Sequence, residues 1–106
     1  MSEDARRSIT NPRNDVLVSA AVAWEITIKK SLGKLEAPDD LEDAINDARF
    51  QMLPITVRHA LEVQRLPPIH QDPFGRILIA QAMCEDLTLV TRDGRILRYD
   101  VRTLEA

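Results

Sequence analysis

Short runs of β-branched and apolar residues alternate along this chain with segments whose apolar residues recur at helical spacing. This alternation is typical of α/β domains, in which helices connect parallel strands. Strands are predicted near residues 15–19, 52–55, 87–91 and 101–104, and helices over residues 2–10, 20–32, 39–48, 56–63 and from 73 onward. No repeat or low-complexity linker interrupts the pattern. The sequence therefore predicts a single α/β domain over residues 1–106, with a short and mostly parallel sheet.

The clearest helix start in the sequence is Asp72-Pro73. An Asp side chain is a favoured N-cap, and Pro fits the first helical position because its missing N–H has no partner there in any case. The paired prolines Pro67-Pro68 just before it exclude regular structure. A second helix start is predicted at Asp39, since Glu42 follows three residues later as in a capping box.

Composition limits the class of protein. A length of 106 residues, of which 44% are hydrophobic and 29% charged, fits one soluble domain with one core. No apolar run is long enough for a membrane span, and no secretory signal follows Met1. The single Cys84 cannot form an internal disulfide, which favours a reducing cytoplasm. With one Cys and two His, the chain also lacks the ligands of a structural zinc site.

Three acids fall where an α/β sheet binds its ligands, beyond the carboxyl ends of the strands. Asp93 lies just past the strand that ends at Thr91, and Glu25 lies in the second turn of the helix after the first strand. Asp72 begins the helix that leads into the strand near residue 89. Carboxylates from separate segments suit Mg²⁺, which prefers oxygen ligands. The three acids are therefore candidate metal ligands, and a phosphodiester could complete the metal's coordination.

Each of these residues also has a purely structural interpretation. Glu25 can be a partly exposed helix residue, Asp72 needs no role beyond capping, and Asp93-Gly94 is ordinary turn chemistry. Cys84 is better explained as a small hydrophobic residue than as a nucleophile. Trp24 is better explained as a core residue than as a platform for base stacking. The net charge of −3 argues mildly against a nucleic-acid binder, although an acidic metal site would mask local basic patches.

Longer strings of residues carry a family resemblance. The segments Val18–Ile26, Asp72–Ala82 and Leu89–Asp93 occur in this order, with His59 and His70 between the first two. Together they resemble a PIN domain, specifically a toxin of the VapC type from bacterial toxin–antitoxin pairs. The resemblance extends from Ser2 to about Leu104.

The resemblance implies a three-layer α/β/α fold and a cytoplasmic endoribonuclease that depends on Mg²⁺ or Mn²⁺. In such enzymes metal-activated water attacks an RNA phosphodiester in line, and a cognate antitoxin holds the toxin inactive. The catalytic and metal-binding acids of the family match Glu25, Asp72 and Asp93. Arg76 and Arg92 are candidates for contacts to RNA phosphates. The family also implies a homodimer.

Two departures from the family pattern predict weak activity. The Asp-Pro-Phe string of the family continues with a second Asp, usually a metal ligand, and this chain has Gly75 there. The family also begins with a short strand that carries an acid, whereas Met1 here is followed by the first helix. That strand would lie in the middle of the sheet, and a strand from another copy of the chain could fill its place.

We therefore expect this chain to cleave RNA poorly or not at all. The alternative function is a catalytically inactive PIN-fold module that binds antitoxin or RNA. A third possibility is an α/β fragment that assembles into oligomers through unpaired strand edges.

Overall fold

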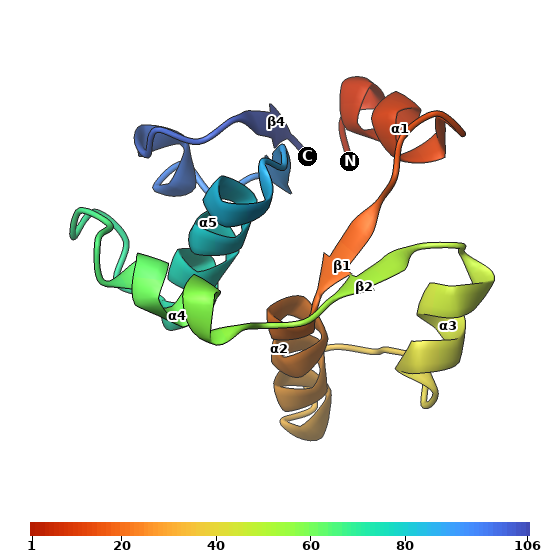
Figure 1. Ribbon diagram of the computed structural model, residues 1–106. Coiled ribbons are helices and arrows are strands. Elements are labelled where there is room, and N and C mark those ends of the chain that lie inside the picture. Colours follow the sequence, from red (N-terminus) through yellow and green to blue (C-terminus); the bar gives the residue numbers. More distant parts are fainter. The chain divides into compact units, whose positions relative to one another are not determined.

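Helices and short strands follow one another in the predicted alternating order in the computed structural model, which describes residues 1–106 (Figure 1). The chain forms two compact units. Unit 1 contains residues 1–14 and 56–106, and unit 2 contains residues 15–55. Every strand pairing is parallel, which confirms the α/β fold class. None of the helices combines the length and the apolar character needed to cross a membrane.

Unit 2 has a parallel pair of strands connected through two helices. Its elements are β1 (Leu17–Ser19), α2 (Ala20–Ser31), α3 (Leu41–Asp47) and β2 (Gln51–Leu53). Leu17 lies opposite Gln51 in the register of the two strands. Ser19 ends β1 and at the same time caps α2, because its hydroxyl accepts a hydrogen bond from the N–H of Ala21 at 3.0 Å. The strand therefore passes into the helix without a loop.

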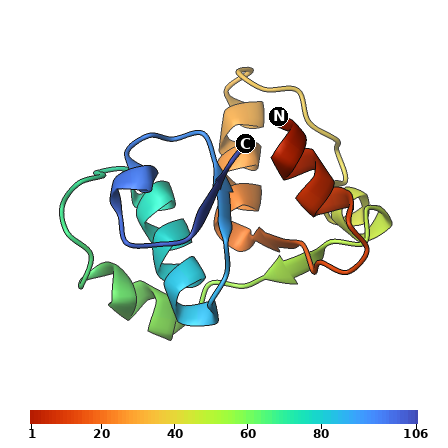
Figure 2. The ribbon, with the colours of Figure 1, turned by 90° about the horizontal axis from the view of Figure 1, so that it is seen from above.

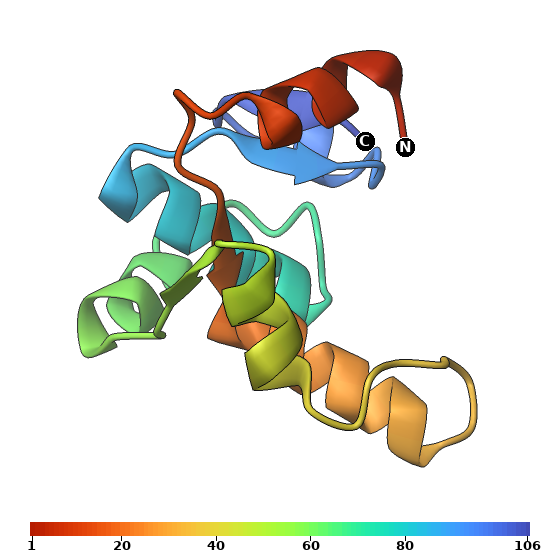
Figure 3. The ribbon, with the colours of Figure 1, turned by 90° about the vertical axis from the view of Figure 1, so that its right-hand side faces the viewer.

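Unit 1 contains the first helix and the second half of the chain. Its elements are α1 (Glu3–Thr10), α4 (Val57–Val63), α5 (Pro73–Glu85), β3 (Leu89–Thr91), the 3₁₀ turn Ile96–Arg98 and β4 (Thr103–Glu105). Helix α4 packs beside α5, and β3 and β4 pair in parallel (Figure 2). Helix α1 lies along the C-terminal strand (Figure 3), where the Ser2 hydroxyl donates to the carbonyl of Glu105 at 2.6 Å.

The core of unit 1 is built around α5. Ile79 and Ala80 are fully buried, and they cluster with the buried residues Leu66, Ile96 and Tyr99. Leu66 and Tyr99 come from segments without regular α-helix or strand, so the core includes loop residues as well as helix residues.

The sequence predicts a short and mostly parallel sheet, and each unit contributes a short parallel pair of strands. The four strands form two separate two-stranded sheets, β1 with β2 and β3 with β4. Each strand is three residues long and has one partner, because the chain contributes no further strand that pairs with a member of either sheet. Parallel pairing is thus confirmed, while a single domain over residues 1–106 stays a prediction.

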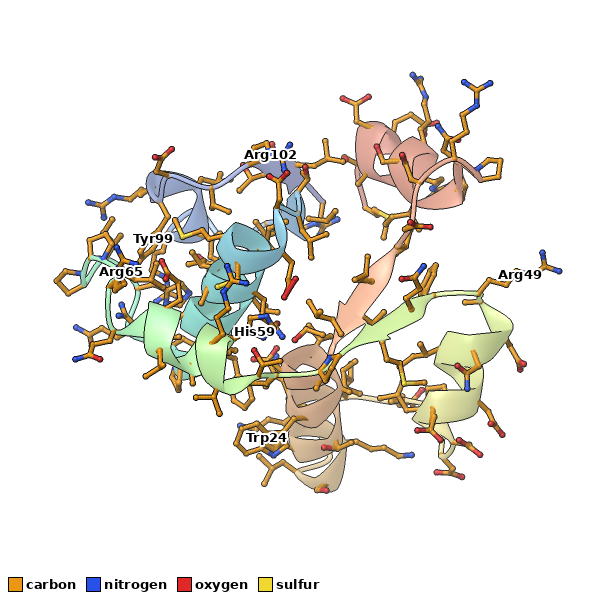
Figure 4. All side chains as sticks on the ribbon, viewed as in Figure 1. Trp24, Arg49, His59, Arg65, Tyr99 and Arg102 are labelled. Carbon is orange, nitrogen blue, oxygen red and sulfur yellow. The ribbon has the colours of Figure 1, made fainter.

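Two details of unit 2 correct the sequence analysis. The N-cap of α3 is Asp40, whose carboxylate accepts the N–H of Asp43 at 3.1 Å. This hydrogen bond lowers the pKa of Asp40. The predicted cap, Asp39, instead pairs with Lys30 at 2.7 Å. Trp24 was predicted to be a core residue, but it is 61% exposed on α2 (Figure 4). The one fully buried residue of this helix is the small Ala21.

Arg76 holds the irregular segment between α4 and α5 in place. Its guanidinium donates to the carbonyl of Val63 at 2.9 Å and to the carbonyls of Pro67 and His70, both at 3.2 Å. The Tyr99 hydroxyl also donates to the carbonyl of Pro67, at 2.7 Å. These donors satisfy backbone carbonyls that no helix or strand can pair.

Replacing Arg76 with Ala should lower the free energy of unfolding by about 2–3 kcal/mol, because several half-buried carbonyls lose a charged donor. Arg76→Lys should recover part of this loss only, since an ammonium group cannot reach carbonyls on both sides of the loop. Urea denaturation measures the effect, with the exposed Arg98→Ala as the control. Equal losses in Arg76→Ala and Arg98→Ala would contradict the role given to Arg76.

Candidate functional site

Asp93 occupies a turn just beyond β3. Its N–H donates to the Thr91 hydroxyl at 3.0 Å, which fixes the direction in which the chain leaves the strand. Carboxylate oxygen Oδ1 accepts the backbone N–H of Arg95 at 2.9 Å. The other oxygen, Oδ2, lies 2.7 Å from Nε2 of His70. The predicted turn is therefore present, and the same carboxylate is held by two separate segments of unit 1.

The hydrogen bonds to Asp93 favour its ionised form. The backbone N–H of Arg95 makes the largest contribution, followed by smaller ones from the Arg95 guanidinium and from His70, and together they lower the pKa of Asp93 from 3.8 to about 2. Asp93 therefore carries a full negative charge at neutral pH, as a ligand of a divalent cation must.

Asp72 is the N-cap of α5, as the sequence predicts. Its Oδ1 accepts the N–H of Phe74 at 3.0 Å, and Pro73 takes the first helical position. The backbone N–H of Asp72 donates to Nδ1 of His70 at 3.1 Å. The capping interpretation is therefore confirmed, and it uses one oxygen of a half-buried carboxylate. Capping does not use the second oxygen.

His70 connects the two acids of unit 1. Its side chain is fully buried, Nδ1 accepts from Asp72, and Nε2 contacts Asp93. Because Nδ1 is an acceptor, the ring proton lies on Nε2, which donates to the carboxylate. Reasoning from residue types missed this contact, since the two partners are 23 positions apart. The one signal was that His70 belongs to the strings that carry the family resemblance.

Glu25 lies in unit 2, on the second turn of α2. It is 37% exposed, and its carboxylate is 3.9 Å from the Lys29 ammonium, one helical turn away. Neither unit by itself brings together three or more His, Cys, Asp or Glu side chains in a metal-binding cluster. The structure thus places Asp72 and Asp93 in one unit and Glu25 in the other, and the three-acid metal site stays a prediction.

The two candidate RNA-binding arginines, Arg76 and Arg92, differ in how many backbone carbonyls accept hydrogen bonds from their guanidinium groups. Arg76 donates to the carbonyls of the loop described above. Arg92 is exposed beside Asp93, and its Nε donates to the carbonyl of Ala106 at 3.0 Å. Contacts of either residue to RNA stay a prediction.

The second histidine, His59, has a structural role between α4 and α5 (Figure 4). Its Nδ1 accepts the N–H of Thr56 at 3.1 Å, and its Nε2 lies 2.9 Å from a carboxylate oxygen of Glu85. The ring is fully buried and joins the first turn of α4 to the last turn of α5. Cys84 is half-buried nearby on α5.

The low pKa of Asp93 predicts acid sensitivity of the metal-free chain. Because the folded pKa of about 2 lies below the ordinary 3.8, the ionised carboxylate stabilises the fold above about pH 4, and this contribution is lost as the pH falls towards 2. The difference in unfolding free energy between wild type and Asp93→Asn should therefore shrink over this range. Urea titrations in EDTA measure it, with the exposed Asp100→Asn as control. A difference that does not change with pH would contradict the prediction.

Comparisons with known proteins identify the family of this chain. The sequence model of the PIN domain family matches residues 1–102 and so spans both units. Ribonuclease VapC16 of Mycobacterium tuberculosis is 38% identical to the chain over 64 residues. The matched segment covers 58% of this chain and 45% of that relative, so the chain spans about half the length of the curated relative it matches. Because the family model covers nearly the whole sequence, the chain belongs to the PIN domain family.

Proposed function

We propose that this chain is a VapC-type toxin that hydrolyses RNA phosphodiesters with the help of Mg²⁺ or Mn²⁺, and that Gly75 makes it a weak enzyme. The observation that carries the proposal is the linkage of Asp72 and Asp93 through His70 in unit 1. Similarity to a ribonuclease supports RNA as the substrate. A cytoplasmic location, a cognate antitoxin and a homodimer belong to the same proposal.

The acids fit a hard divalent cation in chemical type. Asp93 is ionised at neutral pH, and Asp72 has one oxygen that capping does not use. Glu25 would supply the third carboxylate. A cation bound by these groups supplies Lewis-acid polarisation of the phosphate and lowers the pKa of a water molecule. Gly75 supplies no carboxylate oxygen. The site therefore carries less negative charge to hold the cation than a site with the family's second Asp.

The chain's own residues then have distinct tasks. Asp93, just beyond β3, and Asp72, at the start of α5, would bind the cation. Arg95 and His70 keep the Asp93 carboxylate charged and oriented, because both of its oxygens accept hydrogen bonds from them. Arg92 would bind a phosphate of the substrate, and its exposure and its position next to Asp93 in sequence support this role.

RNA cleavage tests the proposal directly. A panel of tRNA and other structured RNAs should be cut slowly in Mg²⁺ or Mn²⁺ and not in EDTA. Glu25→Gln and Asp93→Asn should each lower the rate by about 100-fold or more, since each removes a charged ligand. Asp100→Asn, at an exposed carboxylate outside the site, should leave the rate unchanged. Cleavage that survives EDTA or Glu25→Gln would point to a contaminating nuclease and contradict the proposal.

One observation favours the alternative of a non-catalytic module that binds RNA or antitoxin. Gly75 is buried under a histidine ring, so the position of the family's second acid is closed and carries no ligand. Tight RNA binding in EDTA, together with no cleavage in either metal, would support this alternative. Metal-dependent cleavage would exclude it.

A further inference from the structure

The ring of His70 lies directly on Gly75. A Cβ atom at position 75 would be 2.8 Å from Nε2 of His70, 3.0 Å from Cδ2 and 3.3 Å from Cε1. The first of these distances is too short for any real Cβ, so either the ring or the helix would have to move. The atom closest to this Cβ is the same Nε2 that donates to Asp93.

The ring has little freedom to give way. Its side chain is fully buried, and both ring nitrogens are engaged, Nδ1 by the N–H of Asp72 and Nε2 by Asp93. The backbone of His70 is also fixed, because its N–H donates to the Tyr99 hydroxyl at 2.8 Å. A shift of the ring away from position 75 would therefore strain or break at least one of these hydrogen bonds.

We propose that His70 is a positioning residue of the acidic site, which consists of Asp72 and Asp93. The His70 ring packs on Gly75, and from this position, here called the seat, it ties Asp93 to the first turn of α5. No side chain at position 75 is compatible with the seat. A carboxylate introduced at position 75 therefore displaces His70 and removes its hydrogen bond to Asp93. The seat itself is a property of the metal-free chain, whereas its importance for metal binding rests on the proposed function.

A double-mutant cycle in EDTA tests the seat. Gly75 is the third residue of α5, where replacing Gly by Ala ordinarily stabilises a helix. In the wild-type background, Gly75→Ala should instead lower the melting temperature, because the methyl group meets the ring. In the His70→Ala background, which opens the space, the same substitution should raise it. This reversal of sign separates a steric seat from a general effect of either substitution.

Gly94→Ala is the matched control. Gly94 lies next to Asp93, and a Cβ there would meet nothing within 4 Å. Its effect on the melting temperature should be the same with His70 or Ala at position 70. If Gly75→Ala stabilises the wild-type chain, or if its effect does not depend on residue 70, the proposed seat is wrong.

Nitrogen-15 NMR of the histidine ring tests the seat in the wild-type chain itself as well as in the variants. In the wild-type chain the His70 ring should show a protonated Nε2 and an unprotonated Nδ1, with a slowly exchanging Nε2 proton. Gly75→Ala should abolish this slow exchange and Gly94→Ala should not. A rapidly exchanging Nε2 proton in the wild type would also overturn the proposal.

Mn²⁺ titration by calorimetry tests the role in metal binding separately. His70→Ala should weaken Mn²⁺ binding by about 10- to 100-fold, the usual effect of losing a group that orients a metal ligand. Unchanged affinity would reject His70 as a positioning residue, even if the cycle confirms the seat. If the wild-type chain binds no Mn²⁺, the metal chemistry of the proposed function and the positioning role both fail, while the cycle and the NMR spectrum still decide the seat.

Discussion

The backbone carbonyl groups of the proline-containing segment between α4 and α5, and the side chains that donate to them, are the interaction on which the rest of unit 1 depends. Pro67 and Pro68 exclude a regular helix there, so side chains from other segments supplement the few local backbone hydrogen bonds, such as the one from the N–H of Ile69 to the carbonyl of Pro67. Arg76 and Tyr99 supply these side-chain donors, from α5 and from the residues after the 3₁₀ turn. Because Tyr99 also receives the N–H of His70, the same network fixes the histidine, and the histidine in turn holds Asp93.

The position of the Asp93 carboxylate therefore depends on the packing of the segment between α4 and α5 as much as on β3. Asp93 follows a strand of only three residues, which by itself would position a side chain poorly. Hydrogen bonds from Arg95 and His70 compensate for the short strand by fixing both carboxylate oxygens. In a PIN domain with Gly75 at the position of the family's second acid, these donors keep the Asp93 carboxylate ionised and oriented.

Much of the local structure followed from the sequence. The Asp72-Pro73 start, the strand before Asp93 and the order of the elements depend on neighbours in the chain, and the structure confirms them. The exposure of Trp24 and the contact between His70 and Asp93 depend on what packs against each side chain, which spacing does not reveal. Asp39 and Asp40 are equally good caps by residue type; in the structure Asp40 caps α3, while Asp39 pairs with Lys30, a contact that spacing does not reveal.

The contact between α1 and β4 affects the order in which the chain can fold. Ser2 and Glu105 are 103 positions apart, and they join the two ends of the sequence within one unit. Closing so long a loop costs conformational entropy and slows folding relative to local contacts. During synthesis, α1 emerges about ninety residues before β4 and cannot form its contact with β4 until that strand has been made. Unit 2 is continuous in sequence, so it can form its internal contacts while unit 1 is still incomplete.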